Sequence, residues 1–244
     1  MNRAPYPFQD FVRAKHSLLS ALVEHLEPFT LLTGETGTGK TALLRQLRGE
    51  LDRARHRVVY FAEAQKLGAA GLVKVVAESL RVRTSMCHSV SLDRLLRALA
   101  DESHTFCLWL DEAHQLPEET LAEARALVES SLEGAPRVQL LLVGLPKLRA
   151  ELQALPYLWR RIAVREELTG LVFEELEPFL THHFCAEQAK RLGEDARHAL
   201  FERANGVPGL IVPMFRAITA RFGSDTTPID PLDVEDTLER WDLA

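Results

Sequence analysis

An eight-residue stretch, Gly34-Glu35-Thr36-Gly37-Thr38-Gly39-Lys40-Thr41, has the residue types and spacing of a phosphate-binding loop. The pattern is Gly, four variable residues, Gly, Lys and Ser/Thr. Glycines let such a loop curl tightly around an anion, and its N–H groups then point inward as an anion nest. We predict that all eight residues contact a nucleoside triphosphate, that Lys40 reaches its β- and γ-phosphates, and that the Thr41 hydroxyl ligates Mg²⁺.

The flanking residues favour this interpretation over a chance glycine-rich turn. Residues 29–33 are a short apolar strand candidate, and residues 42–47 have the pattern of a helix. A helix that begins at the loop adds the positive end of its dipole to the phosphate site. Strand, loop and helix therefore come in the order that phosphate binding requires.

A second candidate site lies about 70 residues downstream, where an apolar strand at 106–110 ends in Asp111 and Glu112. In P-loop proteins an Asp at such a strand end supports the Mg²⁺ shell, and the following Glu can polarise a water for attack on the γ-phosphate. The alternative is an ordinary acidic loop. Residues 111–114 also match a helicase box, but such helicases need a second RecA-like domain, for which 244 residues leave no room.

The order of the predicted elements indicates the fold class. Strand candidates alternate with helices up to about residue 168, and they lie at 29–33, 57–61, 106–110, 138–143 and 162–164. Such alternation implies a parallel sheet with ligands at the carboxyl ends of its strands. Only helices are predicted after Gly170, at 172–188, 194–204, 209–222 and 231–241. We therefore expect an α/β P-loop NTPase core at 1–168, with a parallel sheet sandwiched by helices, and a small all-helical lid domain at 169–244.

The bulk composition bounds the class of protein. The chain has a net charge of −6, three cysteines without paired spacing, no secretion signal pattern and no apolar run long enough to span a bilayer. These features predict a globular cytoplasmic protein without a membrane partner. The charge is uneven, because residues 42–83 contain nine Lys/Arg and four acidic residues, whereas residues 169–244 contain seven and fourteen. This asymmetry suggests two modules with different roles.

With these features the sequence resembles AAA+ ATPases and, among them, the ExeA/TniB group. The residues that carry the resemblance are 32–41, 110–114, 142–148 and 159–162. The group includes helper ATPases encoded beside transposases, similar in role to IstB and the B protein of phage Mu, and also secretion-associated ATPases. The resemblance implies that the chain binds and hydrolyses ATP with Mg²⁺, and that Thr41 and Asp111 hold the metal while Lys40 and Glu112 act in hydrolysis.

The resemblance also implies a contribution from a neighbouring subunit. Arg160 and Arg161 stand where the group has an arginine finger that reaches the γ-phosphate across an interface, and of the two we slightly prefer Arg161. A planar, permanently charged guanidinium stabilises the charge that develops on the transferred group. The alternative is that one or both arginines only pair with Glu166 or Glu167 of the same chain.

Phe8 and Pro208 match positions that flank the adenine in similar ATPases, between the N-terminal lead-in and the lid. Two other positions depart from the group. Leu145 replaces a polar residue after the fourth strand, and Gly209 replaces the Arg of Gly-x-Pro-Arg. Both replaced residues sense nucleotide in the group, so we expect slow turnover unless Arg216 or another residue substitutes.

Basic residues after the second strand are the candidate DNA contacts, because the corresponding surface of transposition helpers faces DNA. They are Lys66, Lys74, Arg81 and Arg83. Such side chains would neutralise phosphates without reading sequence, and binding would be strongly salt-dependent. The alternative is a solvated helix face, and the net negative charge argues weakly in its favour.

We therefore expect an ATPase that assembles head to tail on double-stranded DNA in its ATP state, as a ring or filament, and recruits or regulates a transposase at the target site. One alternative is a secretion or envelope-assembly ATPase of the ExeA type, although the membrane helix and cell-wall domain usual in that type are not predicted here. Another is a nucleotide-dependent signalling switch that does not bind DNA.

Overall fold

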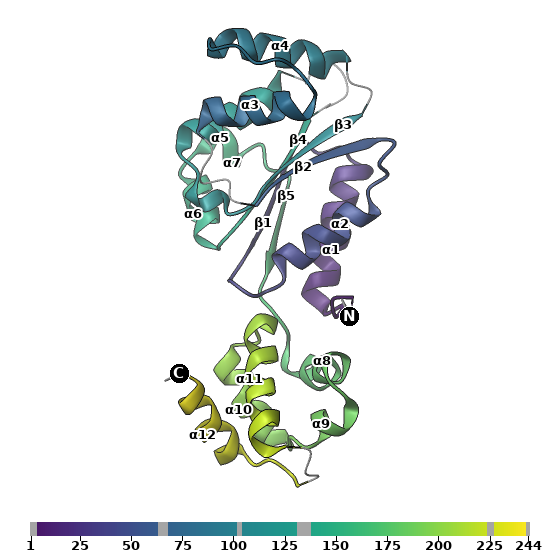
Figure 1. The fold of residues 1–244 in the computed structure, drawn as a ribbon, viewed down its shortest axis with the longest axis vertical. Coiled ribbons are helices and arrows are strands. Elements are labelled where there is room, and N and C mark those ends of the chain that lie inside the picture. Colours follow the sequence, from purple (N-terminus) through teal and green to yellow (C-terminus); the bar gives the residue numbers. More distant parts are fainter. Residues whose placement is uncertain (1–3, 63–67, 102–103, 131–137, 224–226, 243–244) are drawn as a thin grey trace. The chain divides into compact units, whose positions relative to one another are not determined.

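A five-stranded parallel sheet and a group of helices make up the structure, a computed structural model that describes residues 4–62, 68–101, 104–130, 138–223 and 227–242 (Figure 1). Residues 14–34 and 43–167 form one compact unit, the sheet unit. Residues 1–13, 35–42 and 168–244 form a second, the helical unit.

The sheet has the strand order β2-β3-β4-β1-β5. Its strands are β1 (Phe29–Gly34), β2 (His56–Phe61), β3 (Thr105–Leu110), β4 (Val138–Gly144) and β5 (Val164–Leu168). The pairs β1–β4, β3–β4 and β2–β3 are all parallel. The central strands β3 and β4 are apolar and almost wholly buried, as expected for strands covered on both faces. The predicted α/β class with a parallel sheet and a helical C-terminal part is confirmed.

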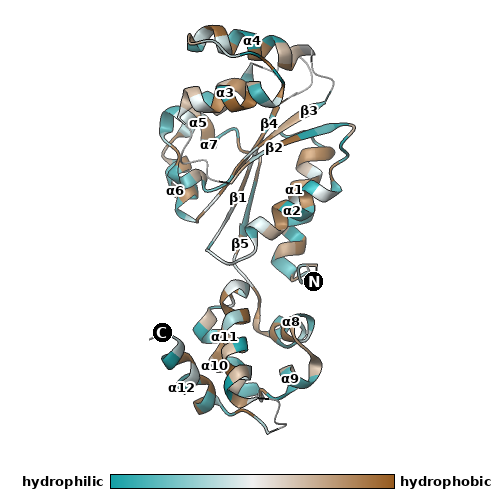
Figure 2. Cartoon of the chain, viewed as in Figure 1, coloured by the Kyte–Doolittle hydropathy of each residue, from teal (hydrophilic) through white to brown (hydrophobic). Residues whose placement is uncertain are grey.

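Helices cover both faces of this sheet. They are α1 (Gln9–Val23), α2 (Lys40–Glu50), α3 (Ala69–Ser79), α4 (His88–Asp101), α5 (Glu118–Glu129), α6 (Lys147–Gln153) and α7 (Pro156–Trp159), with a short 3₁₀ turn, η2 (Ala113–Gln115). In Figure 1, α1 and α2 lie on one face, and α3, α5, α6 and α7 on the other. Most of these helices are amphipathic, with apolar and polar residues interspersed along them (Figure 2).

A buried glutamine on β4 ties the sheet to the end of α1. The Gln139 side chain is fully buried, and its Nε2 donates to the carbonyls of Leu22, at 3.1 Å, and Glu27, at 3.3 Å. Its Oε1 accepts from the Cys107 thiol, at 3.4 Å. All three contacts satisfy an amide that would otherwise be costly to bury.

The last strand begins later than the sequence pattern predicted. Ile162 is not in a strand, because its N–H bonds the carbonyl of Trp159 and its side chain is buried in the core. Ala163 then donates to the carbonyl of Phe29, at 3.2 Å, and β5 runs from Val164 to Leu168. The charged residues inside β5 are compatible with its position at the edge of the sheet.

The helical unit contains η3 (Phe173–Glu175), α8 (Leu176–His183), α9 (Ala186–Lys190), α10 (Glu194–Ala204), α11 (Pro208–Phe222) and α12 (Pro231–Asp242). The single helix predicted at 172–188 is therefore wrong. It breaks at Phe184 and Cys185, whose backbone angles are not helical. The Phe184 ring packs at 4.7 Å from that of Phe215, so tertiary packing of an aromatic side chain overrides the local helical pattern.

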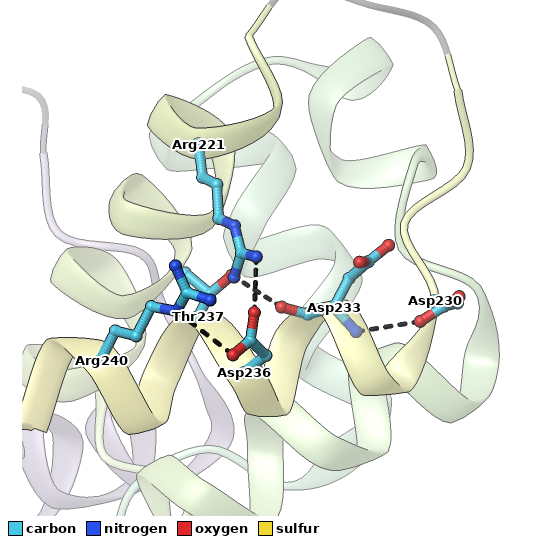
Figure 3. A network of polar contacts seen from close by, with 6 residues as sticks. All are labelled: Arg221, Asp230, Asp233, Asp236, Thr237 and Arg240. Atoms are coloured by element: carbon cyan, nitrogen blue, oxygen red, sulfur yellow. Dashed lines mark hydrogen bonds and ion pairs between the residues drawn. The ribbon is translucent and has the colours of Figure 1, made fainter.

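A charged network fastens α12 to the end of α11 (Figure 3). Arg221 on α11 pairs with Asp236 and donates to the Thr237 hydroxyl, at 2.9 Å. Arg240 contacts the other oxygen of Asp236, at 3.2 Å. The hydrogen bond from Arg221 and the charges of both arginines hold the pKa of the Asp236 carboxyl below its ordinary value. Among the described residues, no helix has the length and apolar character needed to cross a membrane.

Candidate nucleotide-binding site

The phosphate-loop motif follows β1, which ends at Gly34, and runs into α2, which begins at Lys40. Gly37 and Gly39 have φ angles of 88° and 103°, which L-residues with a Cβ rarely adopt. Two of the three motif glycines are thus required by the backbone itself. The strand–loop–helix order predicted for phosphate binding is present.

The carbonyl of Glu35 organises the interior of this loop. It accepts hydrogen bonds from the Thr38 hydroxyl, at 2.8 Å, from the Thr38 N–H, at 3.3 Å, and from Nζ of Lys40, at 2.9 Å. Thr38 is fully buried, and Lys40 is only 8% exposed. The ammonium group is therefore turned into the loop, whereas Thr41, in the first turn of α2, is exposed.

The tip of the loop contacts the N-terminus of α11. The N–H of Gly209 donates to the carbonyl of Gly37, at 2.9 Å. A Cβ added at Gly209 would lie 2.7 Å from Cα of Gly37, which is closer than real Cβ atoms come. Gly209, which stands where the resemblance implied a sensor arginine, therefore packs backbone to backbone against the phosphate loop.

The two residues predicted to flank adenine also belong to the helical unit. Phe8 is 3% exposed, and its ring lies 5.5 Å from the ring of Phe11. Pro208 is the first residue of α11 and is half-buried, which suits proline because the first helical N–H has no intrahelical partner. Val207, the residue before it, packs 3.1 Å from the position of a Cβ at Gly37.

Asp111 stands at the carboxyl end of β3, as predicted, and a tyrosine from β2 holds it. Tyr60 donates its hydroxyl to Oδ2 of Asp111, at 2.7 Å, and Oδ1 accepts the N–H of Glu112, at 2.9 Å. Tyr60 is placed there by the register that pairs it with Trp109. Burial first, and then the bond to Asp111, raise the pKa of the Tyr60 phenol above its ordinary value, so the phenol stays a donor.

Glu112 lies in a strained conformation beside a buried histidine. Its φ of 54° and ψ of 33° are left-handed, which is uncommon for a residue other than glycine. Oε2 of Glu112 lies 3.5 Å from Nε2 of His114, whose side chain is 3% exposed. Nδ1 of His114 accepts the N–H of Leu145, at 3.4 Å. Nε2, the other ring nitrogen, lies toward Glu112 and also lies 3.4 Å from Nε2 of Gln115.

His114 thus connects the acidic end of β3 with the end of β4. The imidazole comes within 3.0 Å of the position of a Cβ at Gly144, so only glycine leaves room for the ring there. Leu145 has no polar side chain, as the sequence indicated, and here its backbone N–H makes a polar contact instead.

The two candidate arginine fingers differ in their surroundings. Arg161 pairs with Glu129 on α5 and donates to the carbonyl of Tyr157, at 2.6 Å. Arg160 is exposed, and its side chain has no polar partner among the residues that the structure describes. Neither arginine pairs with Glu166 or Glu167 in this part of the chain, and Glu167 contacts Arg149.

The structure places three of the predicted DNA contacts on α3 and in the segment that follows it. Lys74 lies on α3 and is 4.0 Å from Glu78, which partly offsets its charge. Arg81 has a φ of 58° in the turn after α3, and Arg83 follows it; both are exposed. Lys66 lies outside the described residues.

Sequence reasoning missed Tyr60 and His114. Tyr60 could have been inferred, because it lies near the end of the apolar strand β2, which is next to the strand that ends at Asp111. A tyrosine hydroxyl at that position has few other partners. His114 was visible as the fourth residue of Asp-Glu-Ala-His, but the partner of its ring lies 31 residues away and could not be read from spacing.

Comparisons with known structures find this fold in several proteins of about 1.5 times this length. Cdc6p from Pyrobaculum aerophilum is 19% identical, with a TM-score of 0.71, over 98% of this chain and 69% of that chain. The Orc1 protein of Aeropyrum pernix, solved in complex with DNA, is 19% identical, with a TM-score of 0.64, over 99% and 66%. A RuvB variant from Thermotoga maritima is 17% identical, with a TM-score of 0.58, over 94% and 66%. At these identities the likeness shows the fold alone.

A search of curated proteins finds no match to the sequence. A family model described as an AAA domain matches residues 23–152. That range is more than half of the chain and includes the phosphate-loop motif, Asp111, Glu112 and the end of β4. The chain therefore belongs to the AAA domain family.

Proposed function

We propose that this chain is an ATPase that binds ATP with Mg²⁺ through residues 34–41. The observation that carries the proposal is the loop itself: Gly37 and Gly39 curl the backbone, and the Lys40 ammonium is buried inside it, bonded to a carbonyl that a phosphate can replace. A loop with this curl offers N–H groups to an anion, and Lys40 adds a positive charge. Orc2 of Aeropyrum pernix, which has the same fold, was solved in complexes with ADPNP and ADP.

Magnesium fits the residues proposed to hold it. Thr41 offers a hydroxyl and Asp111 a carboxylate, and Mg²⁺ prefers oxygen donors of this kind. Asp111 accepts only the hydrogen bonds of Tyr60 and the Glu112 N–H among the contacts described, so lone pairs of its two oxygens remain for a metal-bound water. Bound Mg²⁺ would neutralise charge on the β- and γ-phosphates.

Glu112 is proposed as the general base that polarises the attacking water. The hydrogen bond from the Leu145 N–H holds the His114 ring with Nε2 toward Glu112, and we propose that His114 thereby orients the Glu112 carboxylate. Because residues 145 and 209 lack the usual polar side chains, the proposed turnover is slow.

We further propose head-to-tail assembly in which Arg160 of one subunit completes the site of the next. Arg160 suits this role better than Arg161, because Glu129 and the Tyr157 carbonyl hold Arg161 within its own chain. A heterologous contact of this kind builds a ring or a helical filament. Residues 1–168 would form the nucleotide-binding core and residues 169–244 its lid.

The assembly is proposed to form on double-stranded DNA and to recruit or regulate a transposase, as in the ExeA/TniB group that the motifs resemble. The Aeropyrum pernix Orc1 protein, which has the same fold, was solved in complex with DNA. Basic residues concentrated between 42 and 83 support a polyanion partner despite the net charge of −6.

Wild-type protein and two variants test the nucleotide chemistry. Wild-type protein should bind a fluorescent ATP analogue with Mg²⁺ and release phosphate. Lys40→Ala should lose binding, whereas Glu112→Gln should bind the analogue but release no phosphate, because only its base is removed. Binding by Lys40→Ala at wild-type affinity would contradict the proposal.

Mixing two inactive variants tests the shared site. The Arg160→Ala variant has an intact phosphate loop, and the Lys40→Ala variant has an intact arginine finger. A mixture therefore contains some interfaces in which an intact loop of one subunit meets an intact finger of the other. Phosphate release should return in the mixture and stay absent in each variant alone, and Arg161→Ala is the matched control. Electron microscopy with duplexes of increasing length should show ATP-dependent rings or filaments, and no DNA-dependent assembly at low salt would contradict the DNA part.

A further inference from the structure

A hollow in the surface of the sheet unit, here called the arginine groove, is lined by four arginines. Its volume is about 420 Å³, and it lies between the second half of α2 and the first residues of β2. The arginines are Arg45, Arg48, Arg53 and Arg57, and Leu51 and His56 complete most of its wall. Among the described residues, no acidic side chain lines it.

Three of the four arginines in the groove have no local counter-charge in the part of the chain that the structure describes. Arg45, Arg48 and Arg53 are exposed and have no hydrogen bond or ion pair among the described residues. The nearby acids are occupied elsewhere, because Glu50 pairs with Lys15 at 2.9 Å and Asp52 accepts the N–H of Ala54 at 2.8 Å. Three unpaired guanidinium groups in a chain of net charge −6 require a reason other than stability, because like charges repel.

The shape and chemistry of the groove suit a phosphate backbone. Arg45 and Arg48 are three residues apart on α2 and share one face of the helix. Guanidinium groups bind phosphates through paired hydrogen bonds, and several of them in a row neutralise successive phosphates. Gly49 contributes no side chain, and a Cβ added there would meet nothing within 4 Å, so the groove is open to a bulky strand at this point.

Double-stranded DNA fits better than a single strand or an acidic peptide. Single-strand sites stack bases on aromatic side chains, and the only ring that the described residues place in the groove wall is that of His56, which is 7% exposed and contacts the Asp52 carbonyl. Peptide sites are anchored by apolar pockets, and Leu51 is only 4% exposed. The groove therefore presents positive charge to a partner, and its described residues offer a nucleic acid contacts to phosphate more readily than to bases.

We propose that the arginine groove binds the phosphate backbone of duplex DNA without reading its sequence. The inference rests on the proposed function only in taking DNA as the polyanion. The proposal places the DNA contact on α2 and β2. The sequence pattern predicted a different set of DNA contacts, namely Lys66, Lys74, Arg81 and Arg83.

The test removes two guanidinium groups from the groove. Arg48→Ala/Arg53→Ala leaves Arg45, whose charge acts on Tyr60 beside Asp111, and Arg57, which donates to the Ser79 carbonyl. The control, Arg55→Ala/Arg97→Ala, removes the same charge from exposed arginines outside the groove that are paired with Asp52 and Asp93. Circular dichroism and binding of the fluorescent ATP analogue should be unchanged in both double variants.

Fluorescence anisotropy with a short duplex, at salt concentrations between about 50 and 200 mM, gives the result. Each phosphate that is no longer neutralised should reduce the slope of log K against log salt by about 0.9, so the slope should fall by about 1.8 in the groove variant and stay unchanged in the control. Equal slopes for wild-type and groove variant would overturn the groove and leave the DNA-binding ATPase standing. If wild-type protein binds no DNA, both the groove proposal and the DNA part of the proposed function are wrong. The test of ATP binding with Lys40→Ala does not depend on that result.

Two further outcomes decide the identity of the partner. A phenylglyoxal footprint should show Arg48 and Arg53 protected by duplex DNA and Arg55 still modified, and this readout needs no variant to fold. If polyglutamate binding, and not DNA binding, is lost in the groove variant, the groove takes an acidic protein segment and the proposal is wrong.

Discussion

Replacement of Gly209 by alanine should destabilise the helical unit, although alanine is the better helix former. The added Cβ would lie 2.7 Å from Cα and 3.0 Å from O of Gly37, so α11 and the phosphate loop must separate. The separation breaks the hydrogen bond between the Gly209 N–H and the Gly37 carbonyl, now 2.9 Å long. Because the obstacle is backbone, no side-chain rotation can relieve the overlap.

The magnitude follows from three opposing contributions. The overlap costs about 1–3 kcal/mol, the broken hydrogen bond costs about 1 kcal/mol, and the helix propensity of alanine returns up to about 1 kcal/mol. The net loss is about 1–4 kcal/mol. For a chain of 244 residues, about 2 kcal/mol lowers Tm by about 4–8 °C. Gly209→Arg, which restores the usual residue of the group, should be destabilised by the same overlap.

Differential scanning calorimetry checks this expectation, with Gly49→Ala as the matched control. Gly49 is also helical, but a Cβ there would meet nothing within 4 Å, so this variant should be slightly more stable than wild type. Opposite signs for the two variants are expected. If Gly209→Ala is as stable as wild type or more so, the contact between α11 and the loop does not hold in solution.

Four further outcomes follow from the site and the core. Tyr60→Phe keeps the ring but removes the hydrogen bond to Asp111. Because the loss of a partner of a metal-supporting residue usually lowers activity about 10–100-fold, Mg²⁺-dependent phosphate release should fall by that factor while the fold is retained. Unchanged phosphate release across a Mg²⁺ titration would refute this expectation. His114→Ala should lower kcat for ATP about 10–100-fold and leave KM unchanged, because it loosens Glu112 but touches no substrate, and a change in KM alone would refute the assignment. With a thiol reagent near neutral pH, exposed Cys87 should react first, because the Ser89 hydroxyl lowers its pKa, and Cys107 should react only after unfolding, because burial raises its pKa to about 12. Since the folded pKa of Cys107 lies above its ordinary value of 9.0, its contribution to stability should be intact below pH 9.0 and lost as the pH rises toward 12.

The sequence was sufficient for features that depend on local pattern. The phosphate loop, the apolar strand before Asp111 and the change from alternating elements to helices after Gly170 all follow from spacing and periodicity. The strand candidate at 162–164 began too early, because Ile162 is buried from the segment between α7 and β5, and only Val164 lies in the strand. An apolar pattern indicates which residues are buried, but it does not show whether they lie in a turn or in a strand. The start of β5 is set by the turn that ends α7.

Contacts between distant segments could not be predicted in the same way. The approach of Gly209 to Gly37 depends on how a helix after residue 207 packs against a loop about 170 residues earlier, and no local pattern encodes it. The link from Glu112 through His114 to Leu145 requires the parallel pairing of β3 with β4. The arginine groove likewise appears only when the end of α2 and the start of β2 are folded back beside each other.

The position of β1 in the sheet has a consequence for synthesis on the ribosome. Its neighbours are β4 and β5, so the strand that is made first pairs with the strands that are made last. At about 5–20 residues per second, the hundred or so residues between β1 and β4 take roughly 5–20 s to emerge. For that time an apolar segment, Phe29–Gly34, waits without its partners, and a chaperone that holds nascent chains would have its longest opportunity there.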